Sequence, residues 1–338
     1  MAIVTPSVTR SREIVSRFSG VRVVVVGDLV ADEFIYGEID RVSREAPVLI
    51  LGYTSTEVVP GGAGNAASNA AALGADVTIV GVVGTDDMGA RLLSALPGRA
   101  SIASVARVAS YSTPVKTRIL AGGTHSAKQQ VVRIDRAGGP VVPAVRKRIF
   151  AALARAVRRA DVVIVSDYGI GAITPDMLSE ALTASKRTAP PRVLVDSRYA
   201  LTKFSHITAC TPNESELESL AGVRIGEDRR VLEKAGRSLL RKLACEAVLV
   251  TRGSRGMALF AAGAPTDHIP IVGSDQVTDV TGAGDTVIAV FSLALSAGAS
   301  WAEAAHLANH AGGLVVMKRG TATVTARELL EGIEGGRS

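Results

Sequence analysis

Short valine-rich runs alternate with alanine-rich amphipathic stretches along most of this chain. The apolar runs lie at 21–26, 77–83, 162–166, 192–195 and 247–251. Between them, apolar residues recur at helical spacing in stretches such as 65–73, 144–160 and 230–243. This alternation predicts βαβ units, in which the strands form a mostly parallel sheet with helices on both faces. We therefore expect an α/β fold.

Two segments interrupt the alternation. Residues 34–59 and 113–135 contain no helical repeat, and the parts 115–120 and 130–134 alternate apolar and polar residues as half-exposed strands do. We expect these segments to form a small β flap that could act as a lid. No long Pro/Ser-rich linker divides the chain, so we interpret residues 1–338 as a single domain that carries this flap.

Composition excludes several classes of protein. Apolar residues make up 47% and charged residues 21%, which is ordinary for a globular domain and argues against disorder. No apolar run reaches the roughly 18 residues that span a membrane. Arginines near the N-terminus are not followed by an apolar core and cleavage site, so we expect no signal peptide and a cytoplasmic location.

The net charge of +6 raises the question of nucleic acid binding. Much of the positive charge lies in stretches such as 146–159, where apolar residues at helical spacing leave the basic side chains largely on the solvent side. Single-strand binders interleave aromatic side chains with such charges, and this stretch does not. We therefore expect no nucleic acid partner.

The segment 279–286 reads Asp-Val-Thr-Gly-Ala-Gly-Asp-Thr and leads into the apolar stretch 287–295. Glycine-rich backbone that enters a helix directly offers unpaired N–H groups and the positive end of the helix dipole to an anion. Asp285 would lie in the first helical turn, placed to take a proton from an alcohol while the backbone donors stabilise a moving phosphoryl charge. Alternatively, Asp285 is only an acidic residue at a helix N-terminus, a position that contributes about 0.3–1 kcal/mol.

A second glycine cluster, Pro-Gly-Gly-Ala-Gly-Asn at 60–65, precedes another helical stretch. Its glycine spacing superficially fits a dinucleotide fingerprint, but that fingerprint should directly follow the first strand, which ends here at Gly27-Asp28. The other interpretation is that Gly61 and Gly62 let a ligand approach the backbone while Asn65 hydrogen-bonds it.

Asp28 and Asp32 lie at and just beyond the end of the first predicted strand. Open α/β sheets bind ligands at that edge, and a carboxylate there can accept hydrogen bonds from the hydroxyls of a polyol. Either residue could instead cap a turn.

Thr-Pro-Asn-Glu-Ser-Glu at 211–216 opens a further helix. Asn213 and Glu216 have the spacing of a capping box, which is a structural role. The functional interpretation places Glu216 near a hydrated Mg²⁺ on nucleotide phosphates, because Mg²⁺ keeps several waters and needs few protein ligands.

Some residue types point away from other chemistries. The chain contains no Gly-Lys dipeptide, which excludes a Walker A loop. His306 and His310 lack the glutamate of a zinc protease motif, and we interpret them as ordinary helix residues. Cys210 and Cys245 are too far apart in sequence for a zinc motif and too few for a disulfide framework.

In this order, the motifs resemble those of the ribokinase-like (PfkB) sugar kinases over about 21–325. The resemblance rests on Gly-Asp at 27–28, Gly-Gly-x-x-Asn at 61–65, Thr-Pro-Asn-x-x-Glu at 211–216, Thr-Arg-Gly-x-x-Gly at 251–256 and Asp-x-Thr-Gly-Ala-Gly-Asp at 279–285. It implies a ribokinase-like three-layer fold, an ATP- and Mg²⁺-dependent kinase of a sugar or sugar phosphate, and a homodimer formed through the β lid.

The resemblance also implies roles for single residues. The catalytic group would be Asp285 as base with the turn Gly282, Ala283 and Gly284. The sugar would be held by Asp32, Gly62 and Asn65. ATP would lie along Asn213, Thr251, Gly253 and Gly256, with Asn309 near the adenine. Glu216 would serve Mg²⁺ through water, and Asp279 and Thr281 match positions that supply carbonyls to a monovalent cation such as K⁺.

Within the family, the closest likeness is to the subgroup that phosphorylates the anomeric hydroxyl of a heptose 7-phosphate. The similar stretches lie at 27–37, 41–48, 166–171 and 320–324. The chain departs from that subgroup at Ile170, where a lysine is usual, and at Ser197-Arg198, where Pro-Lys is usual. The alternatives are a ribokinase- or fructokinase-type enzyme for an unphosphorylated sugar and a catalytically silent sensor.

A phosphorylated acceptor would need cations to balance its charge, and arginine binds phosphate oxygens in pairs. The flap and the neighbouring loops offer four candidate arginines: Arg44, Arg118, Arg133 and Arg198.

Overall fold

The computed structural model describes residues 6–123, 128–272, 279–318 and 320–335. Ten strands form the main sheet, in the spatial order β14-β13-β12-β11-β10-β9-β1-β4-β5 with β6 beside β4. In chain order they are β1 (Arg22–Gly27), β4 (Asp76–Gly84), β5 (Ala100–Ser101), β6 (Val105–Val108), β9 (Val162–Asp167), β10 (Arg192–Ser197), β11 (Ala209–Cys210), β12 (Ala247–Thr251), β13 (Met257–Ala261) and β14 (Asp267–Ile269). Only the pairs β12/β13 and β13/β14 are antiparallel.

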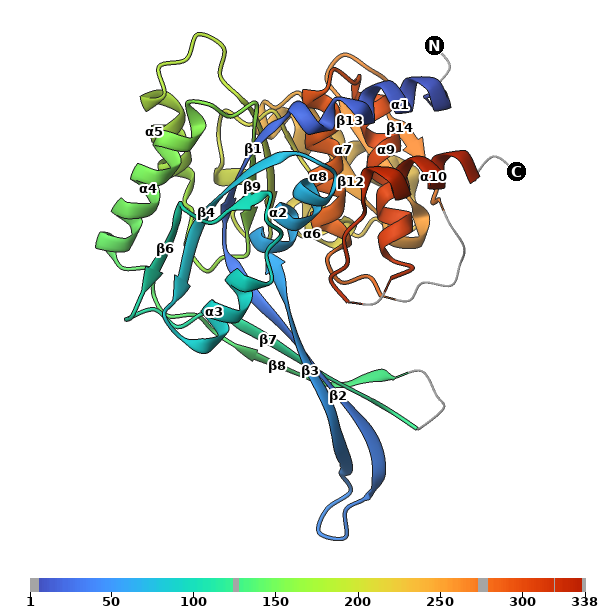
Figure 1. Ribbon diagram of the computed structural model, residues 1–338. Helices are drawn as coiled ribbons and strands as arrows, with labels where there is room; N and C mark the ends of the chain where they lie inside the picture. Colours follow the sequence, from blue (N-terminus) through green and yellow to red (C-terminus); the bar gives the residue numbers. More distant parts are fainter. Residues whose placement is uncertain (1–5, 124–127, 273–278, 319, 336–338) are drawn as a thin grey trace.

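Helices cover both faces of this sheet (Figure 1). They are α1 (Val8–Ser16), α2 (Ala63–Ala72), α3 (Asp87–Ser94), α4 (Pro143–Val157), α5 (Pro175–Ala184), α6 (Glu214–Ala221), α7 (Arg229–Leu243), α8 (Ala283–Ser296), α9 (Trp301–Val315) and α10 (Ala326–Gly335). None of these helices, within the described ranges, is both long and apolar enough to cross a membrane.

Two hydrophobic cores lie on opposite faces of the main sheet because strand side chains alternate in direction. In β1, Val23 and Val25 join the core with α1, α2, α8, α9 and α10, whereas Val24 and Val26 join the core with α4, α5, α6 and α7. The mostly parallel sheet between two helical layers confirms the predicted α/β architecture. Short valine-rich strands and alanine-rich helices therefore behave as their patterns indicate.

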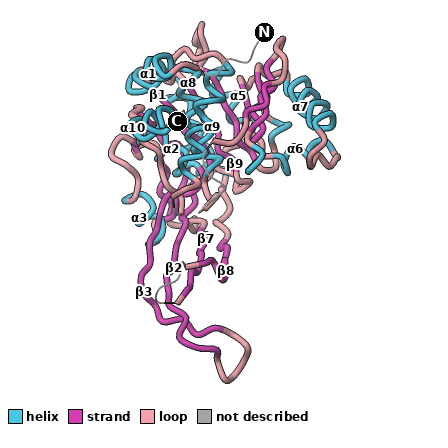
Figure 2. Tube along the Cα trace, turned by 90° about the vertical axis from the view of Figure 1, so that its right-hand side faces the viewer, coloured by secondary structure: helices cyan, strands magenta, loops and turns pink. Residues whose placement is uncertain are grey.

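A second sheet of four strands projects from the body, with β2 and β3 forming a long hairpin (Figures 1 and 2). Its order is β3-β2-β7-β8, formed by β2 (Leu29–Val42), β3 (Leu49–Gly62), β7 (Val115–Gly122) and β8 (Gln129–Arg136). The segments 34–59 and 113–135 lie mostly in this sheet, which we call the flap. Because β2 begins directly after β1 and β3 runs straight into α2, the base of the flap lies at the carboxyl edge of the main sheet.

Candidate active site

A glycine turn opens α8 and leaves its first amides without a side-chain cap. Gly282, with φ +78°, is the N-cap residue, and no side chain bonds the helix end there. A Cβ on Gly282 would collide with the amide nitrogen of Asn65, so the position needs glycine for space as well as for backbone conformation. Uncapped N–H groups at a helix N-terminus form a ready site for an anion.

Asp285 lies in the first turn of α8 and is almost fully buried. Its Oδ2 accepts a hydrogen bond of 2.9 Å from Asn65 Nδ2, and the Tyr168 hydroxyl lies 3.5 Å from its Oδ1. Burial raises the pKa of Asp285 to about 7, against the lowering effect of the Asn65 hydrogen bond. A carboxyl group with a pKa near neutrality can accept a proton from an alcohol and release it again.

Asn65 is held in one orientation by a short chain of hydrogen bonds between α2 and α8. The Asn69 amide donates to Asn65 Oδ1 at 3.1 Å, and the Thr286 hydroxyl donates to Asn69 Oδ1 at 3.0 Å. Asn65 Oδ1 is thereby an acceptor, which leaves its Nδ2 to donate to Asp285. The network locks the base relative to the N-terminus of α2, whose N-cap residue is Gly62 and which also has no side-chain cap.

Tyr168 follows β9 and contacts two cations. Lys116 Nζ, from the flap strand β7, lies 4.7 Å from the centre of the Tyr168 ring, and the Arg198 guanidinium, after β10, lies 5.5 Å from it. The ring also faces Gly62, where a Cβ would come within 3.4 Å of it. Tyr168 therefore forms the floor between the flap, the N-terminus of α2 and Asp285.

Asp28 does not offer its carboxylate to a ligand, contrary to the polyol interpretation. Its two oxygens accept hydrogen bonds of 2.9–3.0 Å from the backbone amides of Tyr168, Ile170 and Ala172. A carboxylate with three amide donors is already satisfied, so the structural alternative holds. Asp28 fixes the loop that carries Tyr168.

Asp32, on β2, forms a buried ion pair with Arg118 of β7 at 2.5 Å. The two side chains are only 7% and 10% exposed. A Cβ on Gly61 would collide with the Asp32 carboxylate, so the glycine lets the carboxylate lie against the backbone. Since Asp32 is also opposite Lys116 in the register of β2 and β7, the inner face of the flap base carries one carboxylate and two cations.

The five residues predicted to contact the nucleotide line one cavity of about 380 Å³. They are Asn213, Thr251, Gly253, Gly256 and Asn309. Ala283 and Gly284 line the same cavity, so it opens onto the glycine turn. Apolar side chains such as Met257 and Val287 complete a slot whose walls suit a flat base.

Asp196 and Glu216 form an acidic pair, in which Asp196 lies beside the glycine turn. Asn213 and Glu216 form the capping box, with Glu216 accepting from the Asn213 amide at 2.9 Å. Burial and the neighbouring Asp285 raise the pKa of Asp196, and burial raises that of Glu216. Carboxylates whose charges disfavour one another suit a hydrated cation, although the described ranges hold no cluster of three or more metal-ligating side chains.

Asp279 and Thr281 lie at the start of the glycine turn. Asp279 Oδ1 accepts from the Thr281 amide at 2.8 Å, and its Oδ2 accepts from the Gly320 amide at 3.1 Å. The Asp279 side chain therefore ties the turn to the segment before α10, which leaves its backbone carbonyl as the group that could face a monovalent cation.

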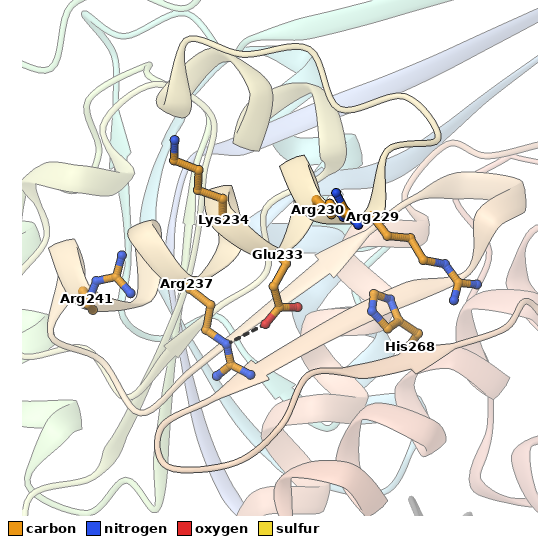
Figure 3. Close-up of a pocket in the computed structure, with 7 residues that line it drawn as sticks. All are labelled: Arg229, Arg230, Glu233, Lys234, Arg237, Arg241 and His268. Carbon is orange, nitrogen blue, oxygen red and sulfur yellow. Dashed lines mark hydrogen bonds and ion pairs between the residues drawn. The ribbon is translucent and has the colours of Figure 1, made fainter.

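A separate basic groove lies along α7 (Figure 3), and none of the site residues described above lines it. It is lined by Arg229, Arg230, Glu233, Lys234, Arg237, Arg241 and His268. The charged ends spread along the helix, and within the groove only Glu233 and Arg237 are joined, by an ion pair of 3.1 Å.

The sequence pattern selected Asp285, Asn65 and the glycine turn, and the structure brings them together. The sequence pattern did not indicate Tyr168, Lys116 or Asp196 as site residues. Of the four candidate arginines, Arg118 is paired with Asp32 and Arg133 with Asp135, Arg44 is exposed on the loop after β2, and Arg198 alone lies on Tyr168. Tyr168 lies in the stretch 166–171, and the similarity of that stretch to the kinase subgroup was the sequence feature that could have indicated it.

Comparison with known proteins agrees with this geometry. Residues 22–327 match the model of the pfkB family carbohydrate kinases. The chain is 38% identical to the bifunctional protein HldE of Geobacter sulfurreducens over 92% of its own length and 62% of that protein, and 39% identical to HldE of Caulobacter vibrioides over 92% and 63%. It thus spans less than two thirds of the length of these relatives.

Solved structures show the same fold. Arabidopsis thaliana ribokinase complexed with ribose and ATP superposes with a TM-score of 0.72 at 23% identity, covering 93% of this chain and 98% of that one. Phosphofructokinase-2 from Escherichia coli in complex with fructose-6-phosphate gives a TM-score of 0.74 at 18% identity, covering 94% and 99%. The predicted ribokinase-like three-layer fold is therefore confirmed.

Proposed function

This chain belongs to the pfkB family of carbohydrate kinases, and we propose that it transfers the γ-phosphoryl group of ATP to the anomeric hydroxyl of a heptose 7-phosphate. The single observation that carries the kinase site is the position of Asp285. It is a buried carboxylate on an uncapped helix N-terminus, between the nucleotide cavity and the base of the flap.

Asp285 is the base in this proposal. It takes the proton of the acceptor hydroxyl as that oxygen bonds to the γ-phosphorus, while the bond from phosphorus to the ADP oxygen breaks. The amides that follow Gly282 face the phosphoryl oxygens, and such preorganised donors supply the larger electrostatic share of catalysis. Asn65 holds the carboxylate toward the acceptor.

Mg²⁺ bound with ATP would neutralise charge on the phosphates. The acidic pair Asp196 and Glu216 fits that role because Asp196 lies beside the glycine turn and Glu216 acts electrostatically on Asp196. Neither carboxylate has an arginine or lysine ion pair within the described residues. Asp279 and Thr281 would supply backbone carbonyls to K⁺ and so hold the turn in shape.

The flap is proposed to act as a lid and as the contact between two copies of the chain. Eight apolar side chains of the flap are exposed, at Ile39, Val42, Val48, Leu49, Tyr53, Val131, Val132 and Ile134. Exposed apolar side chains gathered on one sheet suit burial against a second copy. Tyr53→Asp with Ile134→Asp should shift a dimer to a monomer in analytical ultracentrifugation, and an unchanged sedimentation coefficient would contradict the lid contact.

The heptose acceptor is supported by the stretches 27–37, 41–48, 166–171 and 320–324 and by the similarity to HldE over most of the chain. An ATP-consumption screen over heptose 7-phosphate, unphosphorylated heptose, ribose, fructose and fructose 6-phosphate tests it. We expect the highest kcat/KM with heptose 7-phosphate. If ribose or fructose gives the highest value, the acceptor is an unphosphorylated sugar and only the kinase assignment stands.

A further inference from the structure

Two cations from distant parts of the chain meet on the Tyr168 ring. Lys116 comes from the flap and Arg198 from the loop after β10, and both lie within 6 Å of the ring centre, the range of a cation–π contact. A lysine or arginine held on an aromatic face has fewer conformations to lose when it binds an anion. The ring therefore holds both cations in place before an anion binds. We call Tyr168 with Lys116 and Arg198 the Tyr168 platform.

Neither cation is neutralised by a carboxylate ion pair within the described ranges, unlike most arginines around them. Arg118 pairs with Asp32 at 2.5 Å, Arg136 with Glu33 at 2.9 Å and Arg252 with Glu214 at 2.6 Å. Burial lowers the pKa of Lys116, nearby Asp32 opposes this effect, and Arg198 lowers it further. Two like charges this close together favour an anion between them.

The positions of the two cations relative to Asp285 indicate which anion. Lys116 lies opposite Asp32 in the flap, where we place the acceptor. Arg198 follows Asp196 by two residues at the end of β10, and a Cβ on Gly284 of the glycine turn would lie 3.8 Å from the Asp196 carboxylate, so Arg198 lies on the side of the acidic pair. The Tyr168 hydroxyl, 3.5 Å from Asp285, joins the two sides. The Tyr168 ring and its two cations thus adjoin Asp285 from both the flap and the loop after β10.

We propose that Lys116 and Arg198, held on Tyr168, clamp the phosphoryl group while it moves from ATP to the acceptor. The inference rests on the kinase function proposed above and adds two residues to it. Neither cation forms or breaks a bond: the acceptor oxygen gains the phosphorus, ADP leaves with its bonding electron pair, and Asp285 keeps the proton. The cations balance the charge on the equatorial oxygens, as lysine and arginine clamps do for transferring phosphoryl groups.

The rival role for these cations is to bind the acceptor's own phosphate. In a heptose 7-phosphate that phosphate lies at the opposite end of the sugar from the anomeric hydroxyl, and so away from Asp285. Because the Tyr168 platform adjoins Asp285, the geometry favours the phosphoryl group in transfer. The two roles predict different kinetics, since a clamp on the moving group acts on every acceptor and a phosphate subsite acts only on phosphorylated ones.

The test uses Lys116→Met and Arg198→Met in the full chain, with Lys128→Met and Arg155→Met as controls. Lys128 is another flap lysine on a tyrosine, 5.8 Å from the Tyr36 ring, and Arg155 is exposed on α4. We expect each test variant to lose about 10- to 100-fold in kcat with phosphorylated and unphosphorylated acceptors alike. The controls should stay within about twofold of wild type.

A binding measurement separates lost chemistry from lost folding. Calorimetry would compare ADP·Mg²⁺ alone with ADP·Mg²⁺ plus aluminium fluoride and acceptor, which mimics the phosphoryl group in transfer. Both test variants should bind ADP·Mg²⁺ as wild type does and lose at least about tenfold in affinity for the fluoride complex. Arg198→Lys, which keeps the charge, should recover most of that affinity.

Three outcomes would overturn the clamp. Unchanged kcat and unchanged fluoride affinity would remove any role for the cations in transfer. A loss confined to KM for phosphorylated acceptors would assign them to the acceptor's phosphate instead. If wild type phosphorylates no acceptor in the panel, the kinase function fails first and the clamp fails with it, whereas an active wild type with unaffected variants overturns the clamp alone.

Discussion

The groove along α7 and the cluster of Lys116 and Arg198 on Tyr168 are both basic, and they differ in how their charges are arranged. The groove along α7 has five arginine and lysine side chains, and these come from one helix and point apart (Figure 3). The Tyr168 platform has two cationic side chains, Lys116 from the flap and Arg198 from the loop after β10. Beside the platform lie a buried carboxylate, Asp285, and the open N-terminus of α8.

The difference shows that cations which converge on one point indicate an anion site better than a larger number of cations spread along a helix. Side chains spread along an exposed helix interact through water and salt, which screen them within about 10 Å. Side chains that meet on a half-buried ring have less conformational freedom to lose on binding, and the half-buried Lys116 also acts in a lower effective dielectric, whereas Arg198 is exposed. A basic helix face is thus an ordinary solvated surface, and a small convergent cluster is a site.

The largest effect should come from Asp285→Asn. Without the base, kcat should fall by at least about 10²-fold, while affinity for ATP changes little because the nucleotide cavity is intact. Glu233→Gln, which removes the carboxylate of the α7 groove, is the matched control and should leave kcat unchanged. Steady-state kinetics with calorimetry measures both. If Asp285→Asn retains more than about a third of wild-type kcat, Asp285 is not the base, and the region around Tyr168 is no more important for catalysis than the α7 groove.

Asp32→Asn should weaken the acceptor side of the platform. Loss of a charged hydrogen-bond partner at a buried site costs about 1–3 kcal/mol, so KM for the sugar should rise far more than KM for ATP. The matched control is Glu33→Gln, the next residue on β2, which pairs with Arg136 on the other face of the flap. Equal rises in both KM values for Asp32→Asn would contradict its place beside the sugar.

The pKa of Asp285 gives a pH test. Burial raises it to about 7 from an ordinary value near 3.8, so kcat/KM, which reports the ligand-free enzyme, should fall about tenfold per pH unit below 7 as the base becomes protonated. The same shift destabilises the fold, because the unfolded chain ionises Asp285 more readily. That cost is absent below about pH 4, grows up to about pH 7 and is complete above it.

Asp285→Asn removes this cost. Its free energy of unfolding, measured in urea, should therefore exceed that of wild type at pH 8 by on the order of 4 kcal/mol and match it at pH 4. A variant that is less stable than wild type at pH 8 would show that Asp285 is not a destabilised buried base.

The smallest effect should come from the α7 groove. Replacing Arg229, Arg230 and Lys234 by glutamine should change kcat by less than about twofold and the free energy of unfolding by less than about 0.5 kcal/mol, as for solvated surface residues. Kinetics and urea unfolding of the triple variant measure these quantities. A tenfold loss of activity would mean that the groove, despite its spread charges, serves the reaction.

Sequence patterns predicted the strands, helix starts and caps that depend on residues close together in the chain. The valine-rich runs became strands because both faces of the sheet are covered, and the glycine turn before α8 followed from 279–286 alone. Asn65 and Asp285 each lie at a helix start that the sequence marks, so both could be selected. The capping box of Asn213 and Glu216 was likewise visible in the spacing.

The rest of the site depends on the register and packing of distant segments. Lys116 reaches Tyr168 only because β7 pairs with β2 so that Lys116 lies opposite Asp32. A shift of one residue would turn Lys116 to the other face of the flap. Asp28 was expected to meet a ligand or cap a turn, and only the path of the loop 168–172 shows that three amides use its oxygens. Such contacts have no signature in a single sequence.

Direct detection of the product tests the central claim. Wild-type protein would be mixed with ATP, Mg²⁺ and heptose 7-phosphate and followed by ³¹P nuclear magnetic resonance. We predict one new phosphate ester, coupled to the anomeric proton, formed in equal amount with ADP and missing with Asp285→Asn. Formation of ADP with inorganic phosphate only, or the same product and rate with Asp285→Asn, would contradict phosphoryl transfer to a sugar hydroxyl by this base.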